Sequence, residues 1–125
     1  MTEPIDIQSR EWAEQVEPED RLVMVEYWHH KCVACKKMKP IYEAQPMKFG
    51  DEIKFTRMNL LESKENRRFA IRGGVRSTPT FILYCQGKPV GQIIGPKESE
   101  EFTDEIRKLK DYANNCLMAT PLDEE

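Results

Sequence analysis

Residues 22–28, LVMVEYW, form an apolar run broken by a single acid, and cysteines follow it at positions 32 and 35. A run that is apolar at nearly every position is typical of a strand buried on both faces in a parallel sheet, because a half-exposed strand would alternate apolar and polar residues. The segment after Cys32 changes to helical spacing, with Cys35 three positions further on. The sequence therefore predicts a central strand that ends at a turn carrying two thiols.

The rest of the chain consists of short patterned segments separated by turn residues, without an internal repeat. We expect helices at about 33–49, 63–71 and 99–115, and further strands at 53–58, 80–84 and 89–94. Pro40 predicts a kink in the first of these helices, Pro46 weakens its end, and Gly73 with Gly74 closes the second. The last two strands flank Gly87, which indicates a hairpin, so the predicted α/β sheet is mixed.

The length of 125 residues suits one domain with its own hydrophobic core. A net charge of −3 provides no basic field for nucleic acid. The N-terminus carries acids instead of a basic segment leading into an apolar run, and no stretch is apolar enough to span a membrane. We therefore expect a cytoplasmic protein with no nucleic-acid or membrane partner, in which close cysteines indicate catalysis or metal binding.

Three stretches carry a resemblance to the thioredoxin family: VEYWHHKCVACKKMKP at 25–40, GVRSTPT at 74–80 and GKPVGQIIG at 87–95. The resemblance covers about residues 22–112 and implies a thioredoxin fold, with a mixed central sheet flanked by helices on both faces and a redox dithiol at one end. It places the family's first helix at about 9–16 and an edge strand at 5–7. Residues 1–20 then belong to the same fold, 21–116 form the thioredoxin-like domain, and 117–125 form a flexible acidic tail.

The position of the dithiol at a helix N-terminus has a chemical consequence. Unpaired N–H groups and the positive end of the helix dipole should make Cys32 ionise more readily than a free cysteine. Lys31, His29 and His30 add positive potential if they face the sulfur. We expect Cys32 to be the nucleophile that attacks a partner disulfide and Cys35 to be the resolving thiol that attacks the mixed disulfide. The alternative is a chance pair of core cysteines.

Metal binding is a second interpretation of this segment, because either histidine together with the dithiol offers zinc or copper two sulfurs and a nitrogen. Structural zinc normally takes four protein ligands from two separated clusters, and the other cysteines, Cys85 and Cys116, are predicted elsewhere. We therefore expect no metal and no bound cofactor. For each histidine, the two interpretations are a residue that tunes a thiol pKa or contacts a partner, and an exposed loop residue without a role. Cys85 and Cys116 are interpreted as buried or incidental thiols.

Glu26 is the single acid within the apolar strand. A charged carboxyl that is buried without a partner is so costly that it tends to stay protonated. The resemblance implies that Glu26 matches the family's buried acid, which takes and returns the proton of the resolving cysteine, and that Arg57 replaces a lysine often found beside that acid. Without the resemblance, the alternatives are a Glu26 that faces solvent and an Arg57 that is exposed on its strand.

The resemblance also implies a cis peptide bond between Thr78 and Pro79, although only about 5 to 6% of X-Pro bonds in folded proteins are cis. Such a bond would turn the backbone of Thr78 toward Cys32 and leave its N–H and C=O free to pair with an extended client peptide. Trp28 is expected to support the active-site loop. Lys31 takes the place of a tryptophan that often contacts partners in the family, so we include it among the client-binding residues.

These residues together predict a thiol–disulfide oxidoreductase that reduces disulfides in client proteins and works as a monomer. A separate reductase is expected to reduce its own disulfide again after each turnover. Reduction potentials in this fold class run from about −270 mV to about −120 mV, so the fold alone does not fix the direction of electron flow. The expected reducing compartment favours a reductase. The alternatives are a thioredoxin-fold module that binds metal or a partner without turnover, and a disulfide oxidase or isomerase.

Overall fold

The computed structural model describes residues 3–118, and a five-stranded sheet forms their centre. The strands are β1 (Ile5–Asp6), β2 (Leu22–Trp28), β3 (Ile53–Asn59), β4 (Thr80–Cys85) and β5 (Lys88–Ile94). They lie in the order β1-β3-β2-β4-β5, in which β1, β3 and β2 run parallel while β4 is antiparallel to both β2 and β5. The mixed α/β sheet predicted from the sequence is confirmed.

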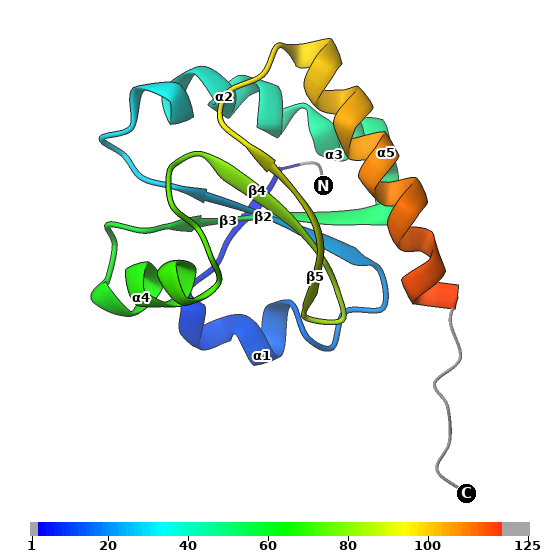
Figure 1. Cartoon of the computed structure of the whole chain (residues 1–125), viewed down its shortest axis with the longest axis horizontal. Helices are drawn as coiled ribbons and strands as arrows, with labels where there is room; N and C mark the ends of the chain where they lie inside the picture. Colours follow the sequence, from blue (N-terminus) through cyan, green and yellow to red (C-terminus); the bar gives the residue numbers. More distant parts are fainter. Residues whose placement is uncertain (1–2, 119–125) are drawn as a thin grey trace, which may run out of the picture.

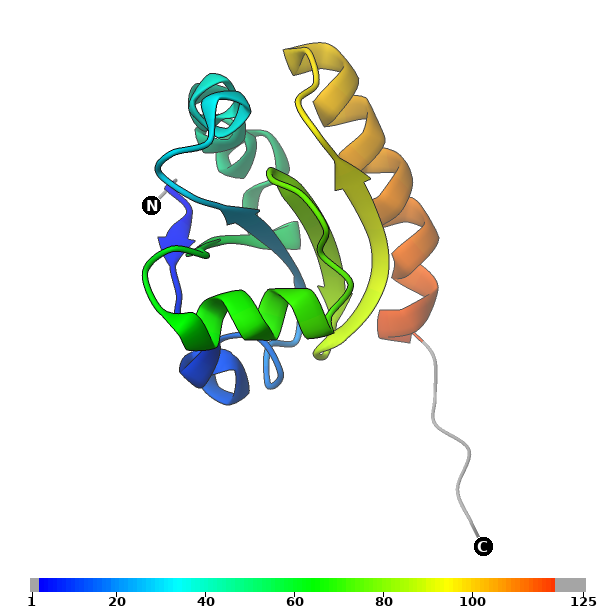
Figure 2. The same ribbon diagram turned by 60° about the vertical axis from the view of Figure 1, so that its left-hand side comes forward.

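Helices cover both faces of this sheet. They are α1 (Trp12–Gln15), α2 (Val33–Glu43), α3 (Gln45–Phe49), α4 (Lys64–Arg72) and α5 (Ser99–Met118), with 3₁₀ turns η1 (Ser9–Glu11) and η2 (Gly50–Glu52). Figure 1 shows α2, α3 and α5 on one side of the sheet and α1 with α4 on the other, and Figure 2 gives the same division from a second direction. This is the layered arrangement of the thioredoxin fold.

The central position of β2 follows from its apolar sequence. Leu22 and Met24 pack into the cluster under α2 and α5, whereas Val23, Val25 and Tyr27 pack into the cluster under α1 and α4. Alternate residues of a strand point to opposite faces, so both faces of β2 are buried. The interpretation of LVMVEYW as a doubly buried strand is confirmed.

The predicted helix at 33–49 is divided in two. α2 continues through Pro40, and a new helix, α3, carries Pro46 in its first turn. A proline is tolerated in a first turn, where its missing N–H would have no partner in any case, but it cannot continue the ladder of a preceding helix. The side-chain amide of buried Gln45 donates to the carbonyl of Ile41 at 2.9 Å and satisfies one oxygen at the end of α2.

Turn residues fix the ends of the later elements. α4 begins where Ser63 Oγ accepts a hydrogen bond from the N–H of Asn66 at 3.0 Å, and it ends before Gly74, whose φ is +91°. The β4–β5 hairpin turns through Gln86 and Gly87, with φ values of +53° and +86°. Positive φ at both central residues matches the two-residue turn whose twist suits a hairpin.

The first strand and the first helical segment lie close to the ranges expected for them, 5–7 and 9–16. β1 is an edge strand, and the first helical segment is a 3₁₀ turn followed by α1, which stops at Gln15. α5 reaches Met118, so the predicted tail at 117–125 begins inside a helix, and its remaining residues lie outside those that the structure describes. Across residues 3–118, no helix combines the length and hydrophobicity needed to cross a membrane.

A second disulfide corrects one interpretation of the sequence. Cys85, at the end of β4, is joined to Cys116, near the end of α5, with their Cα atoms 6.5 Å apart. The interpretation of these residues as buried or incidental thiols is right about the burial of Cys85, which is 0% exposed, and wrong in treating the two as free thiols. Their pairing depends on how α5 packs back against β4, and the spacing of cysteines along a sequence does not contain that information.

Candidate active site

The predicted dithiol lies at the turn between β2 and α2. Cys32 is the N-cap residue of α2, Cys35 lies in the first turn of the helix, and the two are joined as a disulfide. Cys32 is 8% exposed and Cys35 is 3% exposed. The segment WHHKCVACKK therefore places a sulfur pair at the end of the central strand, with Cys32 the more accessible of the two.

The backbone of α2 points a donor at the first sulfur. The N–H of Cys35 is directed at Cys32 Sγ, with the nitrogen 3.2 Å from the sulfur. After reduction, this N–H and the positive end of the helix both stabilise a negative charge on Cys32. The geometry favours Cys32 over Cys35 as the thiolate.

The loop that contains Pro79 lies against the dithiol. The Thr78–Pro79 peptide bond is cis, and the carbonyl oxygen of Thr78 is 3.5 Å from Cys32 Sγ. The disulfide sulfur has no proton to donate, so this is a contact in the oxidised form, and it can become a hydrogen bond when Cys32 is a thiol. The carbonyl of Pro79 accepts from the N–H of Gly95 at 2.8 Å, which ties the loop to the end of β5.

Glu26 is completely buried, with 0% of its surface exposed. It lies on the same face of β2 as Met24, and this face is covered by α2, which turns Cys35 toward the core. The alternative in which Glu26 faces solvent is excluded. The acid is placed beneath the helix that carries the dithiol.

Burial determines the protonation of this acid. It raises the pKa of Glu26 from 4.5 to about 7, against the lowering effect of the Arg57 charge, while the charges of Glu43 and Asp6 raise the pKa further. Neither carboxyl oxygen of Glu26 has a hydrogen-bond partner in the part of the chain that the structure describes. The group is therefore able to bind or release a proton near neutral pH.

Arg57 lies beside Glu26, in register on the neighbouring strand β3. Its Nε atom is 3.6 Å from Glu26 Oε1, too far for a hydrogen bond, and 3.9 Å from Asp6 Oδ1. Its guanidinium carbon lies 4.3 Å from the centre of a ring of Trp28, which is a cation–π contact. The structure therefore brings Trp28, Arg57 and Glu26 together, and the alternative of an exposed Arg57 is excluded.

The sequence model of the thioredoxin family matches residues 3–108, which include the dithiol, the buried acid and the proline loop. The chain belongs to the thioredoxin family. Thioredoxins are protein-disulfide oxidoreductases, and the Cys32–Cys35 pair supplies the redox group that this activity requires. This thioredoxin-family chain is accordingly a thiol–disulfide oxidoreductase that acts on disulfide-containing proteins.

Individual thioredoxins show how far the similarity extends. Thioredoxin M4, chloroplastic, of Arabidopsis thaliana is 34% identical over 102 residues, which are 80% of this chain and 51% of the relative, so the matched part spans about half the length of that protein. The thioredoxin of Alicyclobacillus acidocaldarius subsp. acidocaldarius is 34% identical over 84 residues, 66% of this chain and 77% of the relative. The thioredoxin of Rickettsia prowazekii is 32% identical over 89 residues, which are 71% of this chain and 82% of the relative.

The residues before Cys32 form a hydrogen-bonded turn in this thioredoxin-family site. The N–H of Lys31 donates to Nδ1 of His29 at 3.2 Å, and the N–H of Cys32 donates to the carbonyl of His29 at 3.2 Å. His30 and Lys31 are exposed. Within residues 3–118, no three His, Cys, Asp or Glu side chains are grouped to hold a metal ion, so the geometry gives no support to the metal alternative.

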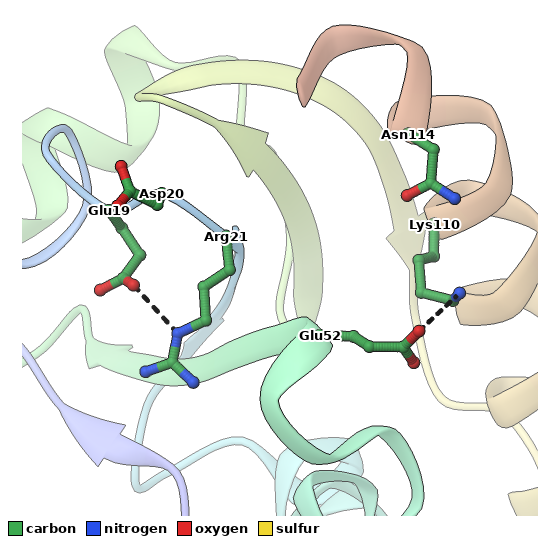
Figure 3. A pocket seen from close by; sticks show the side chains of 6 residues that line it. All are labelled: Glu19, Asp20, Arg21, Glu52, Lys110 and Asn114. Carbon is green, nitrogen blue, oxygen red and sulfur yellow. Dashed lines mark hydrogen bonds and ion pairs between the residues drawn. The ribbon is translucent and has the colours of Figure 1, made fainter. Parts of the chain in front are cut away.

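A separate hollow of about 370 Å³ lies at the opposite end of the sheet. Figure 3 shows two ion pairs among its side chains, Glu19 with Arg21 and Glu52 with Lys110, and Asp20 belongs to neither. The two pairs are 3.0 Å and 3.3 Å long. Glu19 and Arg21 precede β2, Glu52 precedes β3 and Lys110 comes from α5, whereas the dithiol follows the end of β2. We assign this hollow no part in the redox chemistry.

Sequence reasoning missed two residues of the site, Asp6 and Tyr42. Asp6 lies opposite Arg57 in the parallel register of β1 and β3, and an acid in the predicted edge strand was the only signal for it. Tyr42 of α2 is buried and donates its hydroxyl to the carbonyl of Thr56 at 2.6 Å, which ties the helix to the sheet. Its spacing of four residues from Met38 was a signal for the buried face of the helix.

Proposed function

We propose that this thioredoxin-family protein reduces disulfides in client proteins, with Cys32 as nucleophile and Cys35 as resolving thiol. The Cys32 thiolate attacks one client sulfur, the client S–S bond breaks, and the second client sulfur leaves as a thiolate. Deprotonated Cys35 then attacks Cys32 Sγ, which releases the first client sulfur as a thiolate and closes the Cys32–Cys35 disulfide. The observation that carries this assignment is the N–H of Cys35 directed at Cys32 Sγ across 3.2 Å.

The client segment binds beside the proline loop in this proposal. The carbonyl of Thr78, 3.5 Å from Cys32 Sγ, supports backbone pairing with an extended client strand. Pro79 shapes the loop, and exposed Lys31 contacts the client next to the reactive sulfur. Because backbone pairing does not depend on client side chains, this mode of binding suits an enzyme that acts on many proteins.

Glu26 handles the proton of Cys35 in this proposal. Cys35 must lose its proton before it attacks the mixed disulfide, and a carboxyl with a pKa of about 7 is matched to accept it near neutral pH. Glu26 lies on the sheet face beneath α2, which supports a transfer made directly or through one water. Arg57 and Trp28 are positioning residues, because they pack beside the Glu26 carboxyl and keep its surroundings in place.

The setting of the reaction is also proposed. Electrons come from a separate reductase, and the protein acts as a monomer without a nucleic-acid or membrane partner. We assign it to the cytoplasm, although disulfides are rare in that compartment, so the Cys85–Cys116 bond weighs against this assignment. Fractionation of cells whose thiols have been alkylated before lysis tests this assignment, because it shows which compartment holds the protein and whether Cys85 and Cys116 are bonded there.

Turnover of a fluorescence-quenched disulfide peptide, with a limiting dithiol as electron source, tests the proposed function. The wild-type protein is expected to accelerate reduction, and Cys32→Ser to remove the acceleration. Cys116→Ala is the matched control, because it also removes a cysteine but lies outside the site. Reduction no faster with the protein than without it would contradict the proposed function.

A further inference from the structure

A hollow of about 210 Å³ opens beside the dithiol, between the end of β2, the C-terminal half of α4 and the proline loop. Thr78 lines it and also contacts Cys32 Sγ at 3.5 Å, so the hollow adjoins the reactive sulfur. Its floor is apolar, because it includes Leu60 and Val75, which are 8% and 6% exposed. A space of this size and position is suited to one side chain of a bound peptide.

The rim of this hollow is basic. His29 and Arg76 line it, and the backbone of Lys31 is bonded to the ring of His29. In the part of the chain that the structure describes, Lys31 and Arg76 form no ion pair with a carboxylate. Their charges are available to a partner.

Acidic residues at this end of the sheet do not neutralise the rim. Glu98 is paired with Lys37 at 3.6 Å. Glu62, on the connection between β3 and α4, is an exposed acid that forms no ion pair with Lys31 or Arg76. The charges of Arg76 and Lys31 are therefore not cancelled by an acid paired with either of them.

We propose that this hollow selects clients that carry an aspartate or glutamate close to the reactive cysteine, an inference that rests on the proposed function. An extended client segment pairs with Thr78 and places a side chain near its cysteine over the hollow. The methylene groups of that side chain lie on Leu60 and Val75, and its carboxylate meets Arg76 and Lys31. Opposite charges around a docking site speed encounter and discriminate between partners.

Three disulfide peptides that differ only in the two residues after the cysteine, as glutamate, glutamine or lysine, test this inference. At low salt we expect kcat/KM for the glutamate peptide to exceed that for the glutamine peptide about three- to tenfold, the ratio of one or two partly screened ion pairs. The lysine peptide should be the poorest substrate. The preference should shrink as NaCl is raised, because salt screens charges at an exposed rim.

Variants locate the preference on the protein. Arg76→Gln and Lys31→Gln are each expected to lower the glutamate-to-glutamine ratio toward one, whereas Lys108→Gln, an exposed cation on α5, should leave that ratio unchanged. Equal kcat/KM values for the three peptides at low salt would overturn the inference while leaving the oxidoreductase function intact. Failure to reduce any of the peptides would overturn the proposed function and this inference with it.

Discussion

The Glu26 carboxyl lies 3.6 Å from the Arg57 guanidinium inside the sheet, and the two groups are not hydrogen-bonded to each other. A closer, hydrogen-bonded pair would hold the carboxyl ionised at neutral pH. At this separation the effect of burial exceeds the attraction of Arg57, which is why the pKa of Glu26 rises to about 7. The same separation suits Glu26 to the proposed role of proton carrier, because the carboxyl is not fixed in a hydrogen-bonded ion pair.

The rate of client release should depend on pH through Glu26. In the wild-type protein, resolution of the mixed disulfide should slow as the pH falls below about 7, because Glu26 is then protonated and cannot accept a proton from Cys35. Glu26→Gln should lower this rate at least tenfold near neutral pH and remove the inflection. Stopped-flow measurement of single turnovers from pH 5 to 9 checks both effects.

Arg57→Met is the companion variant for this profile. The positive charge of Arg57 lowers the pKa of Glu26, so its removal should shift the inflection to higher pH while keeping it present. An inflection that stays in place in Glu26→Gln would assign the titration to another group and remove Glu26 from the mechanism.

Folding stability should carry the signature of the same carboxyl. The pKa of Glu26 is higher in the folded chain than its ordinary value of 4.5, so the folded state binds the proton more tightly. This contribution is fully present below about pH 4.5 and is lost as the pH rises through about 7, with a total of about 3 kcal/mol. Urea unfolding of the wild-type protein and Glu26→Gln at pH 5 and 8 should show the variant gaining relative stability at pH 8.

Variants of the two active-site cysteines should behave differently. Cys35→Ser keeps the nucleophile but cannot resolve the mixed disulfide, so covalent complexes between Cys32 and clients should accumulate. Cys32→Ser should form none. Non-reducing gel electrophoresis followed by mass spectrometry of the captured adducts checks this, and the opposite pattern would reverse the roles assigned to the two thiols.

The Cys85–Cys116 disulfide should contribute to stability without taking part in the reaction. It closes a loop with a sequence separation of 31 residues, for which the chain-entropy estimate is about 3 to 4 kcal/mol. Cys116→Ala should therefore lower the free energy of unfolding by about this amount while peptide reduction continues. When this disulfide is reduced in the wild-type protein, the free energies of unfolding of the wild type and of Cys116→Ala should become nearly equal. If they still differ, the alanine acts through packing instead.

The sequence predicted the elements of this fold where a local pattern decides the structure. The apolar run at 22–28 predicted the buried strand β2, and Ser63, Gly73 and Gly74 bound α4 through their own turn chemistry. The division at 33–49 was harder to predict, because α2 continues through Pro40 and a second helix starts before Pro46. Local patterns thus identify elements better than they identify the breaks between them.

Long-range contacts were the part that the sequence did not contain. Asp6 meets Arg57 only because β1 pairs with β3 in one register, and Cys85 meets Cys116 only because α5 packs back against the sheet. Glu26 was predictable because an acid inside an apolar strand requires an explanation wherever the strand lies. The position of the carboxyl at 3.6 Å from Arg57 needed the structure.

The reduction potential of the Cys32–Cys35 pair is the most direct test of the central claim, that this chain reduces the disulfides of its clients. The protein is equilibrated in dithiothreitol buffers of graded ratio, free thiols are trapped by alkylation, and peptide mapping separates this pair from Cys85–Cys116. A reductase predicts a value near the reducing end of the fold class, about −270 mV. A value near −120 mV would contradict the claim and indicate a protein that oxidises its clients.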